Sequence, residues 1–216
     1  MKTLVLAVAG LSVLASGLAA QQRPRGTAFA DGAIVRYGTK LGGTEEGSFG
    51  GPTFGLQAGV SLAKFTLSAQ YLEGRLNPRA GSRDTVPRDL VEARLLLGVQ
   101  PVPWLSLGVG PHIRAFVFDT TTVRWVMWQA RARAQGALPS TRLETYVELW
   151  YALSATVNLP APVDHVQGGE AGVLLRPRRS AVWFRLGYRV DGAHLASGGQ
   201  TESVEAVSFG LGIGGR

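Results

Sequence analysis

The protein has 216 residues, a formal net charge of +7 and no cysteine, which excludes a disulfide scaffold, a thiolate metal site and a cysteine nucleophile. A hydrophobic share of 45% also excludes a disordered chain. Charged residues are scarce at 17%, glycine is abundant with 29 residues, and the positive charge comes from 19 arginines and only 3 lysines. This composition bears more on where the protein is located than on what activity it has.

The first twenty residues have the pattern of a secretory signal. Lys2 gives a positive start, an apolar run follows over Leu4 to Ala15, and small residues close the segment up to Ala20. The apolar run is short for a membrane span of about 20 residues. We therefore expect cleavage after Ala20 (or after Ala19), with residues 1–20 as the signal peptide and 21–216 as a single domain.

Beyond this segment, apolar and polar residues alternate with period two, which predicts strands with two different faces. The segment from Arg142 to Val157 is the clearest case, with Leu143, Val147 and Leu149 on one face. About ten strands are expected, in chain order at 33–41, 54–62, 64–71, 91–100, 105–115, 126–135, 142–157, 169–176, 182–190 and 207–213.

Short and long connections alternate between these strands, as in an antiparallel up-and-down arrangement. The short ones are expected at 62–64, 100–103, 136–141 and 177–180, and the long ones at 41–52, 77–87, 117–121, 158–167 and 191–202. They are rich in Gly, Pro, Ser, Thr and Asp. Pro111 cannot donate to a ladder, so the fifth strand is expected to bulge or end near Gly110, and eight strands remain an alternative.

Alternation alone does not distinguish an apolar core inside a water-soluble barrel from an apolar outer surface facing lipid. The polar face is dominated by Gly, Ser, Gln and Arg and holds little Lys, which suits a confined interior better than a solvated surface. Aromatic residues gather toward strand ends, and one set of connections is longer than the other, as in membrane barrels. We expect an all-β, closed transmembrane barrel. A soluble exported barrel that binds a ligand is the alternative.

On these features the chain resembles small bacterial outer-membrane β-barrels of the OmpA/OmpX-like general type, over about residues 27–216. The resemblance implies a place in the bacterial outer membrane, contact with outer-membrane lipid and recognition by the barrel-assembly machinery. The expected last strand ends Ile213-Gly214-Gly215-Arg216, whereas such barrels usually end in an aromatic residue. This departure puts the recognition step in question.

The alternation directs a set of charged side chains into the barrel. The expected interior network consists of Arg36, Glu92, Arg94, Arg114, Arg131, Arg133, Glu144, Glu148, Glu170, Arg185 and Arg189. A barrel of eight to ten strands holds little more than side chains, so a salt-bridged plug and a structural or surface-interacting role are expected. The alternative is a narrow, anion-preferring pore lined by the arginines.

Catalysis, cofactors, metals and nucleic acid have little support in the sequence. His112 falls in the inward register, while Asp164-His165, His194 and Ser197 fall in expected outer loops, where a rim hydrolase is conceivable but its geometry is not indicated. No cysteine and no paired histidines at ligand spacing are present. The basic residues are scattered instead of forming a stripe, which argues against nucleic acid. A ligand of the outer loops is not identified by the sequence.

Overall fold

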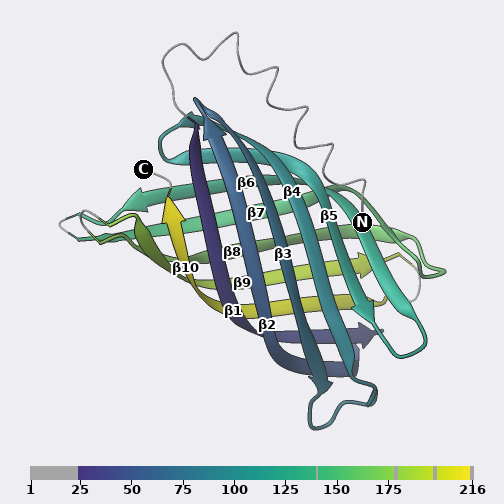
Figure 1. The fold of residues 1–216 in the computed structure, drawn as a ribbon. Helices are drawn as coiled ribbons and strands as arrows, with labels where there is room; N and C mark the ends of the chain where they lie inside the picture. The colour runs from purple at the N-terminus through teal and green to yellow at the C-terminus, as the bar shows by residue number, and fades with distance from the viewer. Residues whose placement is uncertain (1–23, 140, 178–179, 197–198, 215–216) are drawn as a thin grey trace, which may run out of the picture.

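The computed structural model describes residues 24–139, 141–177, 180–196 and 199–214, and the predicted signal peptide lies outside them. Every regular element in these ranges is a strand (Figure 1). The strands are β1 (Arg25–Leu41), β2 (Thr44–Leu62), β3 (Phe65–Pro78), β4 (Arg88–Val102), β5 (Leu105–Val117), β6 (Thr122–Ala137), β7 (Leu143–Val157), β8 (Val163–Leu175), β9 (Val182–Leu195) and β10 (Thr201–Gly214).

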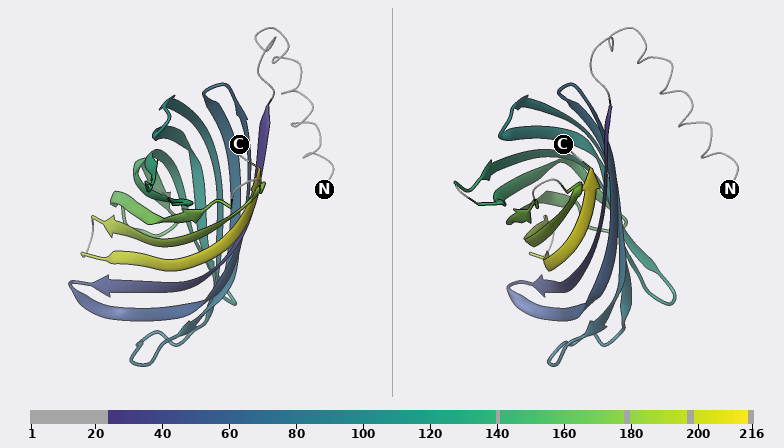
Figure 2. Two further views of the ribbon diagram at one scale, coloured as in Figure 1. Left: turned by 90° about the vertical axis from the view of Figure 1, so that its left-hand side faces the viewer. Right: turned by 60° about the vertical axis from the view of Figure 1, so that its left-hand side comes forward.

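The ten strands form one closed antiparallel barrel in which each strand pairs with its neighbours in sequence. β10 pairs with β1 from Thr27 opposite Gly214 to Lys40 opposite Thr201, which closes the wall (Figures 1 and 2). Closure leaves no free sheet edge, so every strand has partners on both sides. The predicted fold class is confirmed, with ten strands and not eight.

The two ends of the barrel differ. At the short-turn end, β2–β3, β4–β5, β6–β7 and β8–β9 are connected, and the start of β1 meets the end of β10. The other end, here the long-loop end, carries the remaining connections. Ala63 in the β2–β3 turn has φ 53°, in the left-handed region. This conformation is unfavourable for any residue that has a Cβ.

The long connections are shorter than the sequence pattern suggested, and the predicted strict alternation of short and long connections is wrong. The connections 118–121 and 158–162 have four and five residues, no more than 138–142 and 176–181 at the other end. The segment expected as a loop at 41–52 is almost entirely β2, because Gly42 and Gly43, both with positive φ, complete the turn. β9 likewise continues to Leu195, and β8 begins at Val163. Glycine and serine are typical of loops, but cross-strand pairing holds these segments in the wall.

Pro111 is accommodated without ending β5. The β4–β5 ladder pairs Arg94 with His112 and Leu97 with Val109, and the intervening pairs are skipped while the register stays the same. On its other side Pro111 stays opposite Trp128 in β6. A missing backbone donor therefore costs local pairing only, and the predicted bulge or departure at Gly110 is wrong.

β7 contains an irregularity that the alternation did not predict. Ser154 lies opposite Trp128, but Ala152 lies opposite Gln129, so β7 has one extra residue at this point. The bulge reverses the facing of the residues that follow it. Ala155 and Val157, expected on the lipid face with Leu149, instead pack against the interior cluster.

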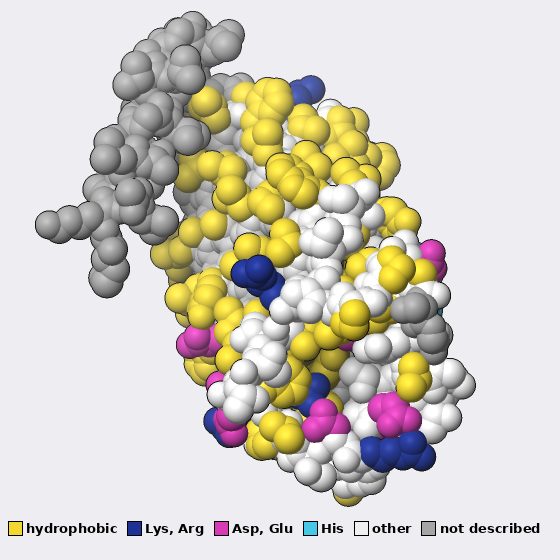
Figure 3. Space-filling view, turned by 90° about the vertical axis from the view of Figure 1, so that its right-hand side faces the viewer, with side chains coloured by type: hydrophobic (Ala, Val, Ile, Leu, Met, Phe, Trp, Pro, Cys, Tyr) yellow, Lys and Arg dark blue, Asp and Glu magenta, His cyan; other side chains and the backbone are white. Residues whose placement is uncertain are grey.

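The outer face of the barrel is broadly apolar. Leu149, Leu153 and Phe209 expose 62%, 63% and 60% of their surface. Each of the ten strands carries at least one large hydrophobic residue that is exposed in this way. In Figure 3 an apolar band covers the upper part of the molecule, and most charged side chains in view gather below it. No helix in the described ranges is long and apolar enough to span a membrane.

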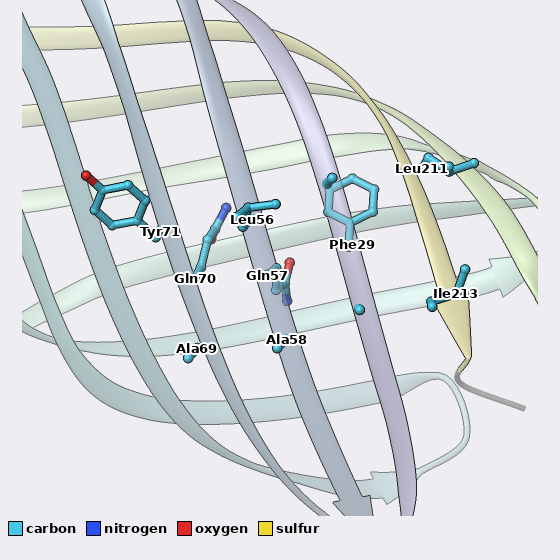
Figure 4. Close-up of a pocket in the computed structure, with 11 residues that line it drawn as sticks. Phe29, Leu56, Gln57, Ala58, Ala69, Gln70, Tyr71, Leu211 and Ile213 are labelled. Carbon is cyan, nitrogen blue, oxygen red and sulfur yellow. The ribbon is translucent and has the colours of Figure 1, made fainter. Parts of the chain in front are cut away.

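A shallow groove of about 570 Å³ crosses this outer face over β10, β1, β2 and β3 (Figure 4). Small side chains such as Ala58 and Ala69 form its floor, and Leu56, Tyr71 and Leu211 border it. The groove is almost entirely apolar in its outward-facing residues. Its chemistry matches hydrocarbon, and the hydroxyl of the bordering Tyr71 is donated to Glu73.

Candidate functional site

The interior is the candidate site because it gathers the charged residues that the alternation pointed inward. Its contents change along the barrel axis, from mainly apolar residues at the long-loop end, with Arg88 and Glu202 buried among them, to a network of ion pairs further along. Each layer is built by inward positions of several strands, spaced two residues apart.

Apolar side chains fill the half of the lumen nearer the long-loop end. Phe49 and Leu76 are fully buried, and Phe116 and Trp125 expose 2% or less. Tyr37 stacks on Phe116 with ring centroids 4.1 Å apart. The buried members of this cluster, called the apolar half below, are Ala33, Val35, Tyr37, Phe49, Leu72, Leu76, Leu90, Phe116, Trp125, Met127, Trp150, Ala152, Val166, Ala193, Leu195, Val204 and Ala206. The alternation of apolar and polar residues does not predict this cluster.

Next to the apolar half, four charged side chains form a central cluster that joins opposite walls. The cluster contains Glu92 of β4, Arg114 of β5, and Arg189 and Asp191 of β9. Arg114 donates its Nε to Glu92 at 2.5 Å and an Nη to Asp191. Arg189 forms two bonds to Glu92, at 2.8 and 2.9 Å. β4 and β9 lie five strands apart in the ring of ten, so these bonds cross the lumen.

Asp191 is the acceptor on which the central cluster converges. It receives hydrogen bonds from Arg114, from Arg189 through Nε at 2.7 Å, and from the indole Nε1 of Trp150 at 2.9 Å. Its exposed fraction is 1%. A buried carboxylate is tolerated only with such full pairing, so the cluster depends on every partner being present.

A polar chain runs from this cluster toward β6 and β7. His112 Nε2 lies 3.7 Å from Glu92, and its Nδ1 is 2.8 Å from the Gln129 amide. Gln129 Oε1 accepts two bonds from Arg131, at 2.9 and 3.1 Å. Arg131 in turn pairs with Glu148. These contacts account for His112 as a hydrogen-bonded interior residue.

Nearer the short-turn end, Arg185 of β9 anchors a second group. It donates to Asp31 of β1 at 3.1 Å, lies 3.9 Å from Glu170 of β8, and covers the ring of Phe29 at 4.0 Å. Tyr146 donates its hydroxyl to Glu170. Separately, Arg176 and Glu144 pair at 3.1 Å beside the β8–β9 turn.

The predicted network residues occupy the following places. Those at inward strand positions are Glu92, Arg94, Arg114, Arg131, Arg133, Glu144, Glu148, Glu170, Arg185 and Arg189. Arg36 is the exception, since its side chain is exposed and Val35 and Tyr37 beside it are buried. Around Arg36 the residues on both faces of β1 are apolar, and Ile34 on the outer face is 63% exposed. The alternation of apolar and polar residues therefore did not show which face of β1 points inward.

Arg36 belongs instead to a set of charged residues on the outer surface. It lies opposite Glu205 in the β1–β10 ladder. On β3 and β4, Arg75 and Asp89 lie 3.9 Å apart, and Glu73 accepts the Tyr71 hydroxyl at 2.6 Å. These charges lie toward the long-loop end of their strands and mark where the apolar band stops.

Four interior charges were missed by the sequence analysis: Asp31, Arg88, Asp191 and Glu202, all at most 7% exposed. Asp191 and Glu202 fell in an expected loop, although the inward phase set by Arg185 and Arg189 continues through Asp191. With these residues, the inward strand positions hold seven arginines and seven carboxylates. The overall arginine excess that suggested an anion pore is therefore absent from the described strands.

The outer histidines also come together. His165 Nδ1 lies 2.7 Å from Asp164, and the rings of His165 and His194 stack with centroids 4.2 Å apart. Ser197, the conceivable nucleophile, lies outside the described residues. Within the described part of the chain, no group of three or more His, Cys, Asp or Glu is arranged to hold a metal ion.

Comparison with known proteins supports the fold. No family model and no curated protein matches the sequence. The translocator domain of the autotransporter NalP from Neisseria meningitidis superposes with a TM-score of 0.50 at 12% identity, over 97% of this chain and 95% of that one. The chain has the fold of a small bacterial outer-membrane β-barrel.

Two further structures align less well. Neisserial surface protein A gives a TM-score of 0.38 at 12% identity, covering 86% of this chain and 96% of its own. The transport unit of the autotransporter AIDA-I from Escherichia coli gives 0.41 at 10% identity, covering 87% and 89%. At these identities the likeness concerns the fold, so the function has to be argued from the barrel itself.

Proposed function

We propose that the protein is a bacterial outer-membrane barrel with a closed lumen, whose role is structural or is exerted by surface interaction at the long-loop end. The observation that carries this proposal is a lumen filled by the apolar half and crossed behind it by the central cluster of Glu92, Arg114, Arg189 and Asp191. Export by the predicted signal peptide supports the location. Outer-membrane lipid and the barrel-assembly machinery are the partners that such a location requires.

The outer surface supports insertion in lipid. A barrel in water would leave Leu149, Leu153 and Phe209 in contact with solvent, at about 25 cal/mol for each Å² of apolar surface. In hydrocarbon that cost disappears, and the closed ladder satisfies the backbone polar groups. This favours the membrane over the alternative of a soluble exported ligand carrier.

The interior supports closure. The apolar half fills the lumen with Phe49, Phe116, Trp125 and their neighbours, and the central cluster follows directly behind it. An ion would have to displace buried apolar side chains and then separate desolvated ion pairs. Both obstacles oppose conduction, and both lie on the same path.

The outer surface of the long-loop end is the part free to meet other molecules. Asp164 and the stacked pair of His165 and His194 lie there. We infer that the protein acts at this end by surface interaction.

Current across planar bilayers tests the closed lumen. The purified protein is expected to insert without stepwise conductance. The double variant Arg114→Ala/Arg189→Ala, checked for folding by its heat-dependent gel mobility, is expected to remain closed because the apolar half is intact. Discrete anion-selective steps from the wild type would overturn the proposal and establish the narrow pore.

Cell fractionation tests the location independently. The protein is expected in the outer-membrane fraction, with a gel mobility that changes on boiling as folded barrels unfold. Recovery of the whole pool from the soluble fraction, with identical mobility before and after boiling, would contradict membrane insertion.

A further inference from the structure

A hollow of about 210 Å³ lies in the lumen toward the short-turn end, on the far side of the polar chain from the apolar half. Its walls come from β1 to β7. They include three arginines, Arg94, Arg131 and Arg133, but only one carboxylate, Glu148. The charges of the interior balance as a whole, yet here they leave a local surplus of two positive charges.

Among the arginines at inward positions of the described strands, Arg94 is the one that has no carboxylate partner. Its guanidinium donates to the amide oxygen of Gln70, a neutral partner. Within the described ranges, no carboxylate lies within ion-pair distance of it. Burial of a cation beside a neutral acceptor is costly, because the amide returns only part of the solvation that water provides.

Glu148 cannot serve the remaining arginines fully. It pairs closely with Arg131, and its other oxygen lies 3.8 Å from Arg133. The buried Nε of Arg133 has no hydrogen-bond partner among the described residues. The guanidinium groups around the hollow therefore have more N–H donors than the single carboxylate of Glu148 can accept.

The remaining walls supply space and small polar groups. Ser68 and Ser106 offer hydroxyls, and Gly59, Gly98 and Gly108 have no side chains to fill the volume. At Gly108 an added Cβ would meet only ordinary contacts, 3.6 Å from the Leu97 carbonyl oxygen and 3.9 Å from the Gly98 Cα. The space is therefore not required by close backbone packing at this position.

We propose that this hollow is a binding site for a small dissolved oxyanion of the sulfate or phosphate class. Such an ion is rich in acceptors, carries the charge that the walls lack, and is small enough for a cavity of this size together with some water. Arg94 and Arg133 are its principal ligands. The hollow is only partly enclosed, so a dissolved ion can reach it, and the site does not depend on the proposed closed lumen or surface role.

Sulfate titration of the folded protein in detergent tests the site, with sodium chloride adjusted to keep ionic strength constant. The melting temperature of the wild type is expected to rise saturably with sulfate, as ligand linkage requires. Arg94→Gln is expected to weaken sulfate affinity at least about tenfold, and to melt at or above the wild-type temperature without sulfate because the surplus charge is smaller.

Gly108→Leu provides a variant that keeps every charge and fills the hollow. It is expected to lose the sulfate-dependent shift. Gly136→Leu is its matched control, since an added Cβ there meets nothing within 4 Å and the residue lies outside the cavity on β6. Arg176→Gln is the matched charge control, because Arg176 pairs with Glu144 elsewhere at the same end.

Two results would overturn the proposal. One is the absence of a saturable sulfate effect on the wild type at constant ionic strength, with phosphate equally ineffective. The other is sulfate affinity in both Arg94→Gln and Gly108→Leu equal to that of the wild type and of the two controls. Direct calorimetric titration separates binding from any general effect of sulfate on melting.

Discussion

The two halves of the lumen are stabilised by different kinds of interaction. The apolar half packs aromatic and aliphatic side chains as a soluble protein core does, without one-to-one pairing of charges. The region behind it depends on ion pairs between distant strands, where each charge needs its partner. One barrel interior can therefore be closed twice, once by packing and once by charge, and only the closure by charge was visible as a sequence pattern.

The largest effect is expected from breaking the charged region at its centre. Arg114→Ala removes a donor to both Glu92 and Asp191 and leaves buried carboxylates underpaired. The free energy of unfolding should fall by about 3–5 kcal/mol. Guanidinium titration of the barrel in lipid vesicles, followed by tryptophan fluorescence, measures the loss.

The control for that substitution is Arg83→Ala, which removes the exposed ion pair with Glu46 at 2.8 Å. Its expected cost is at most about 1 kcal/mol. Equal losses in the two variants would mean that the central cluster contributes no more than a surface pair.

A comparable break in the apolar half is Leu76→Ala. Leu76 is fully buried, so truncation leaves a cavity and is expected to cost about 2–5 kcal/mol. The same titration measures it. The double variant Leu76→Ala/Arg114→Ala measures whether the two closures are coupled. If they act independently, the two losses in the free energy of unfolding should add.

The outer face offers a smaller effect that tests which solvent surrounds the barrel. Leu149→Arg places a charge midway along β7 on the apolar band, at an expected cost of about 2–4 kcal/mol in bilayers. Thr44→Arg, at the exposed start of β2, serves as control with an expected cost near zero. No difference between the two variants in vesicles would argue against a lipid-facing band.

The smallest expected effect leaves both halves of the lumen intact. Ala63 holds a positive φ in the β2–β3 turn, and glycine adopts that conformation without steric cost. Ala63→Gly should therefore stabilise the barrel by up to about 1 kcal/mol. A measurable loss of stability would show that the unfolded-chain entropy of glycine outweighs the relief of strain.

Period two predicted the fold because closure of an antiparallel wall needs only strand number, facing and alternating connections. Arg142 to Val157 showed this most clearly, and β7 does form there. The same segment also shows where the pattern fails, since a single extra residue near Leu153 redirects Ala155 and Val157 inward. A bulge is set by the pairing of two strands, so the sequence of one strand does not reveal it.

The candidate site was predicted less completely than the fold. Residues such as Glu92 and Arg189 stand in strongly alternating strands, and their facing could be assigned. Asp191, on which the cluster converges, was assigned to a loop because glycine and serine follow it. Which arginine meets which carboxylate depends on contacts across the lumen, and no local pattern encodes those.

The long strands give the barrel an unusual rim. β1 and β2 have 17 and 19 residues, whereas a tilted crossing of the bilayer takes about 9–11. The surplus lies beyond Arg36 at the long-loop end, where the wall continues as paired sheet up to the turn at Gly42. A molecule that binds this rim would contact a preorganised sheet. Binding there would cost less conformational entropy than binding to a flexible loop.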